Sequence, residues 1–228
     1  MKNCNALEVH TARRILLIAC TTALGMALTV GLPQPAHADR VTPPAVPADI
    51  QLPPGATAFL VGHGVGTQNY VCLPCPNPST PPGTKCPDSG FAFQLFTPQA
   101  TLFADNEKQI ITHYFSPNPD EDGKIRVTWQ DSHDTSTVWA FATGAATTAT
   151  DPQFVRPGAV AWLRLQVVGR ETGPIGSNTL GPTTFIQRLN TDGGLAPSTG
   201  CSSSADVGHE EFVPYTADYF FFTGGESN

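Results

Sequence analysis

The chain has 228 residues, with 12 basic and 19 acidic side chains, a formal net charge of −7 and only 14% charged residues. This balance excludes a coiled coil, a collagen-like repeat and a basic nucleic-acid-binding protein. With 21 Gly, 22 Pro and 13 Phe, the composition favours an all-β domain that has many turns and an aromatic core.

Residues 1–38 have the pattern of an export signal that is cleaved after Ala38. Arg13 and Arg14 supply positive charge, an apolar run follows over 15–30, and small residues precede the cleavage point. The run is shorter than the roughly 20 residues that a membrane-spanning helix needs. We therefore predict a secreted, periplasmic or extracellular protein with no membrane contact after cleavage, exported by either the general or the twin-arginine route.

Two proline-rich stretches divide the rest of the chain. Residues 39–56 are predicted to be a leader that runs extended over the surface, because their prolines disfavour a helix. Residues 57–223 are predicted to form a single β domain, in which 73–90 is a proline-rich loop clipped by a disulfide. Residues 224–228 are predicted to be a frayed tail.

Four cysteines remain after removal of the signal: Cys72, Cys75, Cys86 and Cys201. An even number in an exported chain predicts disulfides, and four cysteines allow three pairings. We favour Cys75–Cys86 across the proline-rich loop together with Cys72–Cys201 between an early strand and a late loop. A redox centre at Cys72-x-x-Cys75 and a zinc site of four thiolates are the alternatives, and no metal or cofactor is predicted.

Segments in which apolar and polar residues alternate with a period of two indicate about nine to ten short strands. They are 58–65, 67–72, 91–95, 101–103, 109–115, 126–131, 138–141, 163–167, 183–190 and 219–222. No stretch has a long apolar stripe at helical spacing. The sequence therefore predicts a single-domain antiparallel β-sandwich or barrel.

A glycine-rich segment, Gly62-His-Gly64-Val-Gly66, follows an apolar strand. Its third glycine stands one position too early for the dinucleotide-binding pattern, and no helix follows it. We interpret the segment as a bend within a strand, so a dehydrogenase is not expected.

Acid–base chemistry would have to draw on scattered residues. His113 or His209 is the candidate base, and Asp131, Glu210 or Asp218 is the candidate acid. No two of the histidines stand close together in sequence, and no compact catalytic motif accompanies them. A secreted carbohydrate-active hydrolase or lyase is the alternative function that these residues support.

A ligand-binding face is predicted from Gln68, Tyr70, Gln187, Arg188 and Asn190. Arg188 with Asn190 suits an acidic or polar ligand, although a salt bridge that orders the neighbouring loop also explains Arg188. Aromatic residues on strands suit either a sugar-stacking platform or a core; these residues are Trp129, Trp139, Trp162, Tyr70, Tyr114, Tyr215 and Tyr219. The predicted partner is an extracellular ligand, with polysaccharide as a candidate, and not nucleic acid.

Four ordered blocks carry a family resemblance: G-x-G-T-Q-N-Y-x-C at 64–72, A-W-L-R-L at 161–165, T-T-F-I-Q-R-L-N-T-D-G-G at 183–194 and V-P-Y-T-A-D-Y-F-F at 213–221. The chain resembles the family called domain of unknown function 3455, whose members are exported proteins of bacteria and filamentous fungi. The resemblance spans about 45–222 and implies no established activity. It implies that Cys72 pairs with Cys201, since both flank family segments, and that Cys75 and Cys86 form an extra clip.

Taken together, these features predict a non-enzymatic module of the cell exterior or cell wall that binds a ligand or serves a structural role.

Overall fold

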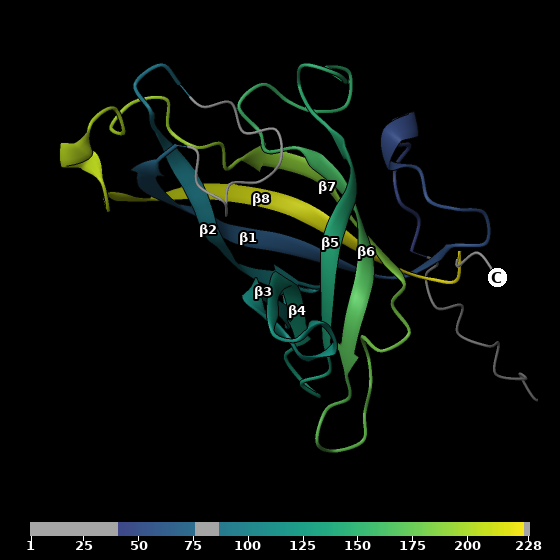
Figure 1. Ribbon diagram of the computed structural model, residues 1–228. Helices are drawn as coiled ribbons and strands as arrows, with labels where there is room; N and C mark the ends of the chain where they lie inside the picture. The colour runs from purple at the N-terminus through teal and green to yellow at the C-terminus, as the bar shows by residue number, and fades with distance from the viewer. Residues whose placement is uncertain (1–40, 76–86, 226–228) are drawn as a thin grey trace, which may run out of the picture. The chain divides into compact units, whose positions relative to one another are not determined.

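The structure is a computed structural model that describes residues 41–75 and 87–225. The described residues form eight strands, and each strand pairs antiparallel with the next along the chain. β1 also pairs with β8, so the sheet is a closed barrel (Figure 1). The all-β antiparallel prediction is confirmed, and the barrel is the correct one of its two forms. The strands are β1 Thr57–Pro74, β2 Phe91–Phe103, β3 Gln109–Asn118, β4 Lys124–Asp131, β5 Thr137–Ala146, β6 Trp162–Glu171, β7 Phe185–Gly193 and β8 Glu210–Thr223.

Fewer strands form than the nine to ten predicted, because two of them are longer than the alternation suggests. β1 joins the segments 58–65 and 67–72, and β2 joins 91–95 and 101–103. Asn69 of β1 pairs with Thr97 and Tyr70 pairs with Leu95, which leaves Phe96 of β2 as an extra, unpaired residue. Such a bulge changes which side of the sheet the next residues face, so the alternation of β2 breaks after Leu95. In β1 the predicted break falls at Gly66, which has no side chain to continue the alternation.

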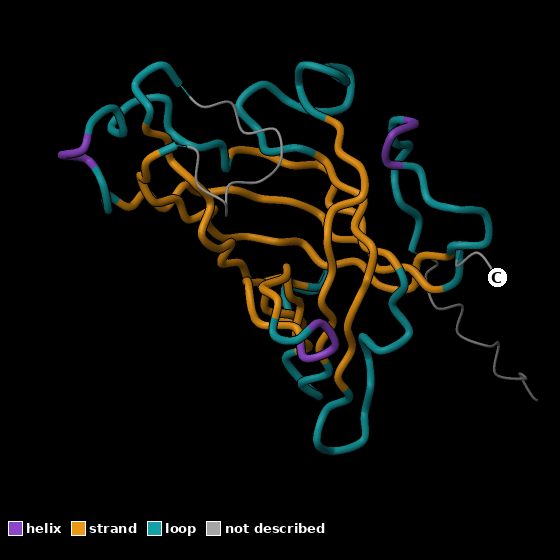
Figure 2. The backbone as a smooth tube through the Cα atoms, in the orientation of Figure 1, coloured by secondary structure: helices purple, strands orange, loops and turns teal. Residues whose placement is uncertain are grey.

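Helical structure in the described residues is limited to three short 3₁₀ turns, so the backbone between the loops is almost entirely strand (Figure 2). The turns are Ala48–Ile50, Pro119–Glu121 and Ser204–Asp206. No helix of the described residues is long and apolar enough to cross a membrane.

The hydrogen-bonded ladders differ in length around the barrel. β1 pairs with β8 from Thr57 opposite Thr223 to Val71 opposite Glu210, and the two strands run side by side in Figure 1. The β2–β3 ladder is short and ends at Ala100 opposite His113. Two residues before Ala100, β2 contains a proline, which has no N–H to donate to a ladder. The pairing of β2 with β3 therefore stops at Ala100 and does not extend toward the start of β2.

Glycines on β1 allow neighbouring groups to come unusually close to its backbone. A Cβ atom added at Gly66 would lie 2.1 Å from the Gln99 carbonyl oxygen, and one at Gly64 would lie 2.9 Å from the Tyr219 ring. Gly62, Gly64 and Gly66 all lie inside one continuous strand. The glycine-rich segment is thus part of the barrel wall and not a dinucleotide-binding turn.

The proline-rich leader packs on the outer face of the barrel. Within it, the 3₁₀ turn Ala48–Ile50 places Ile50 fully buried against outward-facing residues of β6, β7 and β8. Its backbone is tied to the barrel as well, since the Gln187 amide donates to the Ile50 carbonyl at 2.7 Å and Arg164 donates to the Gln51 carbonyl at 2.7 Å. The leader therefore covers an apolar outer surface that would otherwise face water.

A disulfide joins Cys72 near the end of β1 to Cys201 in the loop before β8, with a Cα–Cα distance of 5.4 Å. This part of the disulfide prediction is confirmed. Cys86 lies outside the described residues, so the Cys75–Cys86 bridge stays a prediction. The predicted export signal also lies outside them.

We expect Gly66→Ala to destabilise the protein by about 3 kcal/mol, because the new methyl group collides with backbone and not with a movable side chain. For a domain of this size the loss lowers Tm by roughly 6–12 °C, which thermal unfolding followed by circular dichroism measures. Val65→Ala, at the neighbouring exposed position, is the control and should change Tm little. An unchanged Tm in Gly66→Ala would show that the wall has room at this point.

We expect the loss of the Cys72–Cys201 bridge to cost about 4–5 kcal/mol, because the bridge closes a loop with a sequence separation of 129 and restricts the unfolded chain. Denaturant unfolding of the Cys72→Ala, Cys201→Ala double variant gives this free energy. The Cys72→Ala single variant should lose about as much, since either change breaks the bond. A loss below about 1 kcal/mol would contradict the expected role of the bridge.

Candidate functional site

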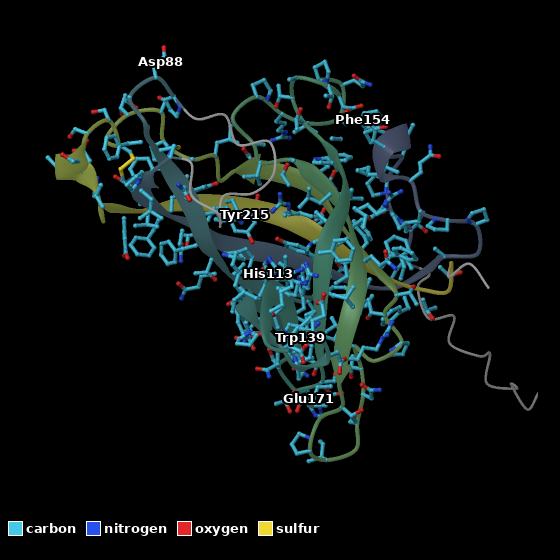
Figure 3. The ribbon with its side chains drawn as sticks, viewed as in Figure 1. Asp88, His113, Trp139, Phe154, Glu171 and Tyr215 are labelled. Carbon is cyan, nitrogen blue, oxygen red and sulfur yellow. A yellow bond between two sulfur atoms is a disulfide. The ribbon has the colours of Figure 1, made fainter. Side chains whose placement is uncertain are left out.

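A cavity of about 380 Å³ lies inside the barrel, at the end where β1 finishes and β2 begins. Most of its lining is apolar: Phe93, Leu95, Pro98, Phe115, Val127, Trp129, Ala142, Val160, Leu163 and Leu165. At its rim Leu195 is 48% exposed, so the cavity reaches solvent there. Figure 3 shows Asp88 and Glu171 at opposite ends of the barrel, with His113 between them. His113 forms part of the inner lining.

The opposite end of the barrel is filled. The connection between β6 and β7 turns back on the barrel and places Leu180, which is fully buried, in the same apolar cluster as Ile111 and Val138. The Thr179 hydroxyl and N–H hold this connection by donating to Asp134 at 2.7 and 2.8 Å. The cavity is therefore a pocket with a floor and not a channel.

Arg188 on β7 points into the cavity and holds part of its wall. Its Nε and Nη2 donate to the Ala161 carbonyl at 3.1 and 2.8 Å. In the parts of the chain that the structure describes, no carboxylate pairs with Arg188, so the expected salt bridge to the neighbouring loop is not formed there. Arg188 does order that loop, but through a backbone carbonyl.

His113 lies deep in the cavity, 3% exposed, with its ring stacked on Trp129 at a centroid distance of 4.4 Å. Its Nδ1 donates to the Thr128 carbonyl at 2.9 Å. Burial and, to a smaller extent, the positive charge of Arg188 lower the pKa of His113 to about 3, although the hydrogen bond to Thr128 opposes the shift. The imidazole is therefore neutral at neutral pH.

Tyrosine hydroxyls in and beside the lining add neutral polar groups. Tyr70 donates to the Gly194 carbonyl at 2.7 Å, and the Tyr215 and Tyr219 hydroxyls lie 3.0 Å apart. Burial raises the pKa of all three phenols, although the Arg188 charge opposes the rise in each case. They are therefore neutral hydroxyls that can donate as well as accept hydrogen bonds.

Two buried donors beside the cavity are poorly satisfied. The Gln68 side chain is 2% exposed and has only the Tyr215 hydroxyl as a partner for its Nε2, and the Nε1 of the fully buried Trp129 makes no hydrogen bond. Leaving such a group unsatisfied costs about 1–3 kcal/mol, and native structures keep few of them. Both atoms are buried out of reach of solvent, so they are features of the packing behind the cavity surface.

Residues 53–223 match the family described as protein of unknown function, DUF3455. The chain belongs to the DUF3455 family. No curated protein and no solved structure matches the chain. The matched DUF3455 region begins before β1 and ends with β8, so it contains all eight strands of the barrel.

The ligand-binding residues predicted from the sequence divide into two groups in this DUF3455 barrel. Gln68, Tyr70 and Arg188 line the cavity. Gln187 faces the leader on the outer side, because it precedes Arg188 and adjacent strand residues point to opposite faces. Asn190 has a positive φ of 51° at a register shift, and its amide donates to the outward-facing Asp218 at 2.7 Å.

The candidate catalytic residues are not brought together. Only His113 lines the cavity. The Asp131 carboxylate accepts from the backbone N–H groups of His133 and Asp134 at 2.8 and 2.9 Å, so it stabilises the turn after β4. His209 lies at the surface, 3.5 Å from Glu211.

The aromatic residues proposed as a sugar-stacking platform do not form an exposed one. Trp129, Tyr215 and Tyr219 are buried inside the barrel, and Trp162 is buried under the leader and the loop before β6. Tyr70 turns its ring into the cavity. Trp139 is buried as well, and Tyr114 is partly buried. Of the seven, only Tyr70, Trp129 and Tyr219 line the cavity. The sequence could not single out Leu163, Phe93 or Phe115 as wall residues, since nothing distinguishes them from core residues.

No group of three or more His, Cys, Asp or Glu side chains in 41–75 and 87–225 is placed to hold a metal ion. Within the same ranges, His63 is the one histidine whose two ring nitrogens both contact carboxylates. Its Nε2 lies 2.8 Å from Asp105 and its Nδ1 lies 2.7 Å from Asp218. These three residues lie on the outer side of the barrel, away from the cavity lining. Hydrogen bonds to Asp105 and then to Asp218 raise the pKa of His63.

We expect the stability of the protein to fall with decreasing pH in the range 6.5 to 4.5 because of His113. The pKa of His113 is about 6.5 in the unfolded state and about 3 in the folded state. Between these values the unfolded state binds a proton on His113 and the folded state does not. One such proton costs about 1.4 kcal/mol per pH unit over this window. Denaturant unfolding at stepped pH values measures the slope.

His113→Asn keeps a donor near Nδ1 but does not titrate, so its slope should be flatter than that of the wild type by about one proton. The contribution of His63 does not interfere: its pKa is raised, so its stabilisation is complete below 6.5 and is lost only on the alkaline side. Equal slopes in the two proteins, or an NMR titration of His113 with a midpoint near 6, would contradict this account.

Proposed function

We propose that this protein binds a small, mainly apolar molecule inside the barrel. The observation that carries the proposal is the pocket of about 380 Å³, closed at one end and lined mostly by apolar side chains. Ligand sites in proteins span about 300–1,000 Å³ and combine an apolar lining with a few placed polar groups. Eight-stranded barrels are wide enough to hold one small ligand among their inward side chains.

The pocket is supported by a rigid surround. Arg188 and Tyr70 fix the two sides of the rim through the Ala161 and Gly194 carbonyls. The Cys72–Cys201 bridge ties β1 to the loop beside this end of the barrel. A cavity held open in this way does not have to be formed when the ligand arrives, which lowers the free-energy cost of binding.

The proposal places this binding outside the cytoplasm. Disulfides persist in oxidising compartments, and the Cys72–Cys201 bridge is consistent with the export signal predicted over 1–38. The proposed role is that of a binding module. The candidate base His113 has no candidate acid beside it in the cavity, and the one candidate acid that pairs closely with a histidine, Asp218, binds His63 on the outer face. The inward-facing aromatic rings suit a small molecule better than a polymer.

We expect purified, oxidised protein to bind apolar probes of this size, and Leu163→Trp to abolish the binding by filling the pocket. The panel consists of decanoate, decan-1-ol, 2-naphthoate and 2-naphthylmethanol, tested by thermal shift and isothermal titration calorimetry. A ligand at about 100 times its Kd adds roughly 2.7 kcal/mol, which raises Tm by several degrees.

Val65→Trp is the matched control, because it adds the same side chain at an exposed position on the outer face. It should bind the probes as the wild type does. Absence of binding by all four probes to the wild-type protein would overturn the proposal. Unchanged binding to Leu163→Trp, in protein that still unfolds cooperatively, would move the site out of the barrel.

A further inference from the structure

We propose that the natural ligand carries a carboxylate or a similar small oxyanion and that Arg188 binds this group inside the barrel. The inference rests on the proposed function, since it names the chemistry of the molecule that occupies the same pocket. It begins from the charge of the lining. Of the described residues that line the cavity, none is Asp, Glu or Lys, and His113 is neutral, which leaves Arg188 as their one charge at neutral pH.

The Arg188 charge is not compensated by the protein. The guanidinium has five N–H groups; the Ala161 carbonyl takes two of them and the Tyr219 hydroxyl accepts another, and both acceptors are neutral. A charged group that is partly removed from water in an apolar site is stabilised when an opposite charge pairs with it. Because no described carboxylate does so, the pairing partner that fits is an anion from outside the chain.

The neutral polar groups of the lining do not compensate this charge either. The Tyr219 hydroxyl is hydrogen-bonded to the guanidinium and lies 3.0 Å from the Tyr215 hydroxyl, and burial raises its pKa, so it stays neutral. Tyr70 is likewise a neutral phenol, and its hydroxyl donates to the Gly194 carbonyl. The described lining therefore contains a cationic donor and no anionic acceptor, which matches an oxyanion and not an amine.

The apolar remainder of the lining determines the rest of the ligand. Phe93, Phe115 and Leu163 form walls with no charge, so the anionic group must be attached to an apolar body. An alkyl chain and an aromatic ring both satisfy this requirement. The shared chemistry is a carboxylate on a hydrophobic body, and the experiment separates the two kinds of body.

The test compares headgroups on the same body. At pH 7.5, where the carboxylates are ionised, isothermal titration calorimetry gives the Kd of decanoate against decan-1-ol and of 2-naphthoate against 2-naphthylmethanol. Hydrogen bonds to a charged group contribute about 1.5–3 kcal/mol, so we expect at least one carboxylate to bind about 10- to 100-fold more tightly than its alcohol. If the decyl pair shows the larger preference for the carboxylate, the apolar part of the ligand is an alkyl chain; if the naphthyl pair does, it is an aromatic ring.

Arg188→Met removes the charge and keeps much of the side-chain volume, and it should reduce the preference below about threefold. Arg188→Lys keeps the charge but loses the fork of donors, so it should retain part of the preference. Arg164→Met is the matched control. Arg164, on the neighbouring strand β6, also donates to backbone carbonyls but does so on the outer face, so its loss should leave the preference unchanged.

The outcomes separate the inference from the proposed function. Equal Kd values for each carboxylate and its alcohol in the wild-type protein would overturn the oxyanion inference and leave the pocket as a binding site. A preference that survives in Arg188→Met would overturn the assignment to Arg188. Absence of binding by all four probes would overturn both proposals. The wild-type comparison needs no variant, so the inference stays testable if Arg188→Met fails to fold.

Discussion

The backbone ladder between β1 and β8 is the contact on which the rest of the structure depends. It joins the first and last strands of the barrel along nearly their whole length, from Thr57 opposite Thr223 to Val71 opposite Glu210. Without it the sheet would have two long edges with unpaired backbone groups, which invite association with other chains. Closure satisfies those groups and gives the sheet an inside, so that every second residue of each strand faces a lumen.

Two further features adapt the closed sheet to its surroundings. Glycines at one face of β1 remove side chains where Leu102 and Tyr219 need the space, so bulky residues from other strands can fill the barrel there. Outside, the leader and the loop before β6 bury the opposite face. As a result Phe220, Phe221 and Phe222 are all buried, although neighbouring residues in a strand point in opposite directions. A strand covered on both faces reads as a continuous apolar run.

The pocket arises where this packing stops. Toward one end the lumen is filled by apolar side chains and by the β6–β7 connection. Toward the other the side chains leave a cavity that contains Arg188, His113 and Gln68. The polar groups differ in state: His113 is neutral and bound to a backbone carbonyl, whereas Arg188 keeps its charge without a carboxylate partner. The cavity combines an apolar lining with one localised positive charge, in a protein whose formal net charge is −7.

Local patterns were sufficient for the fold class and for part of the site. Alternation with a period of two predicted an antiparallel β domain, and cysteine spacing with the family resemblance predicted the Cys72–Cys201 bridge. The same alternation located Gln68, Tyr70 and Arg188 on strands. It could not separate Arg188 from Asn190, because the bulge after Leu189 turns Asn190 outward.

By itself, the sequence determined which residues alternate along a strand, since that property depends only on the local backbone. Only the tertiary structure decided which of the two faces lies inside, how many strands close the barrel and which polar groups lack partners. These properties depend on contacts between strands far apart in the chain: β1 meets β8, and Arg188 on β7 shares a cavity with His113 on β3. Sequence periodicity carries no information on such distances, and the function of the pocket depends on them.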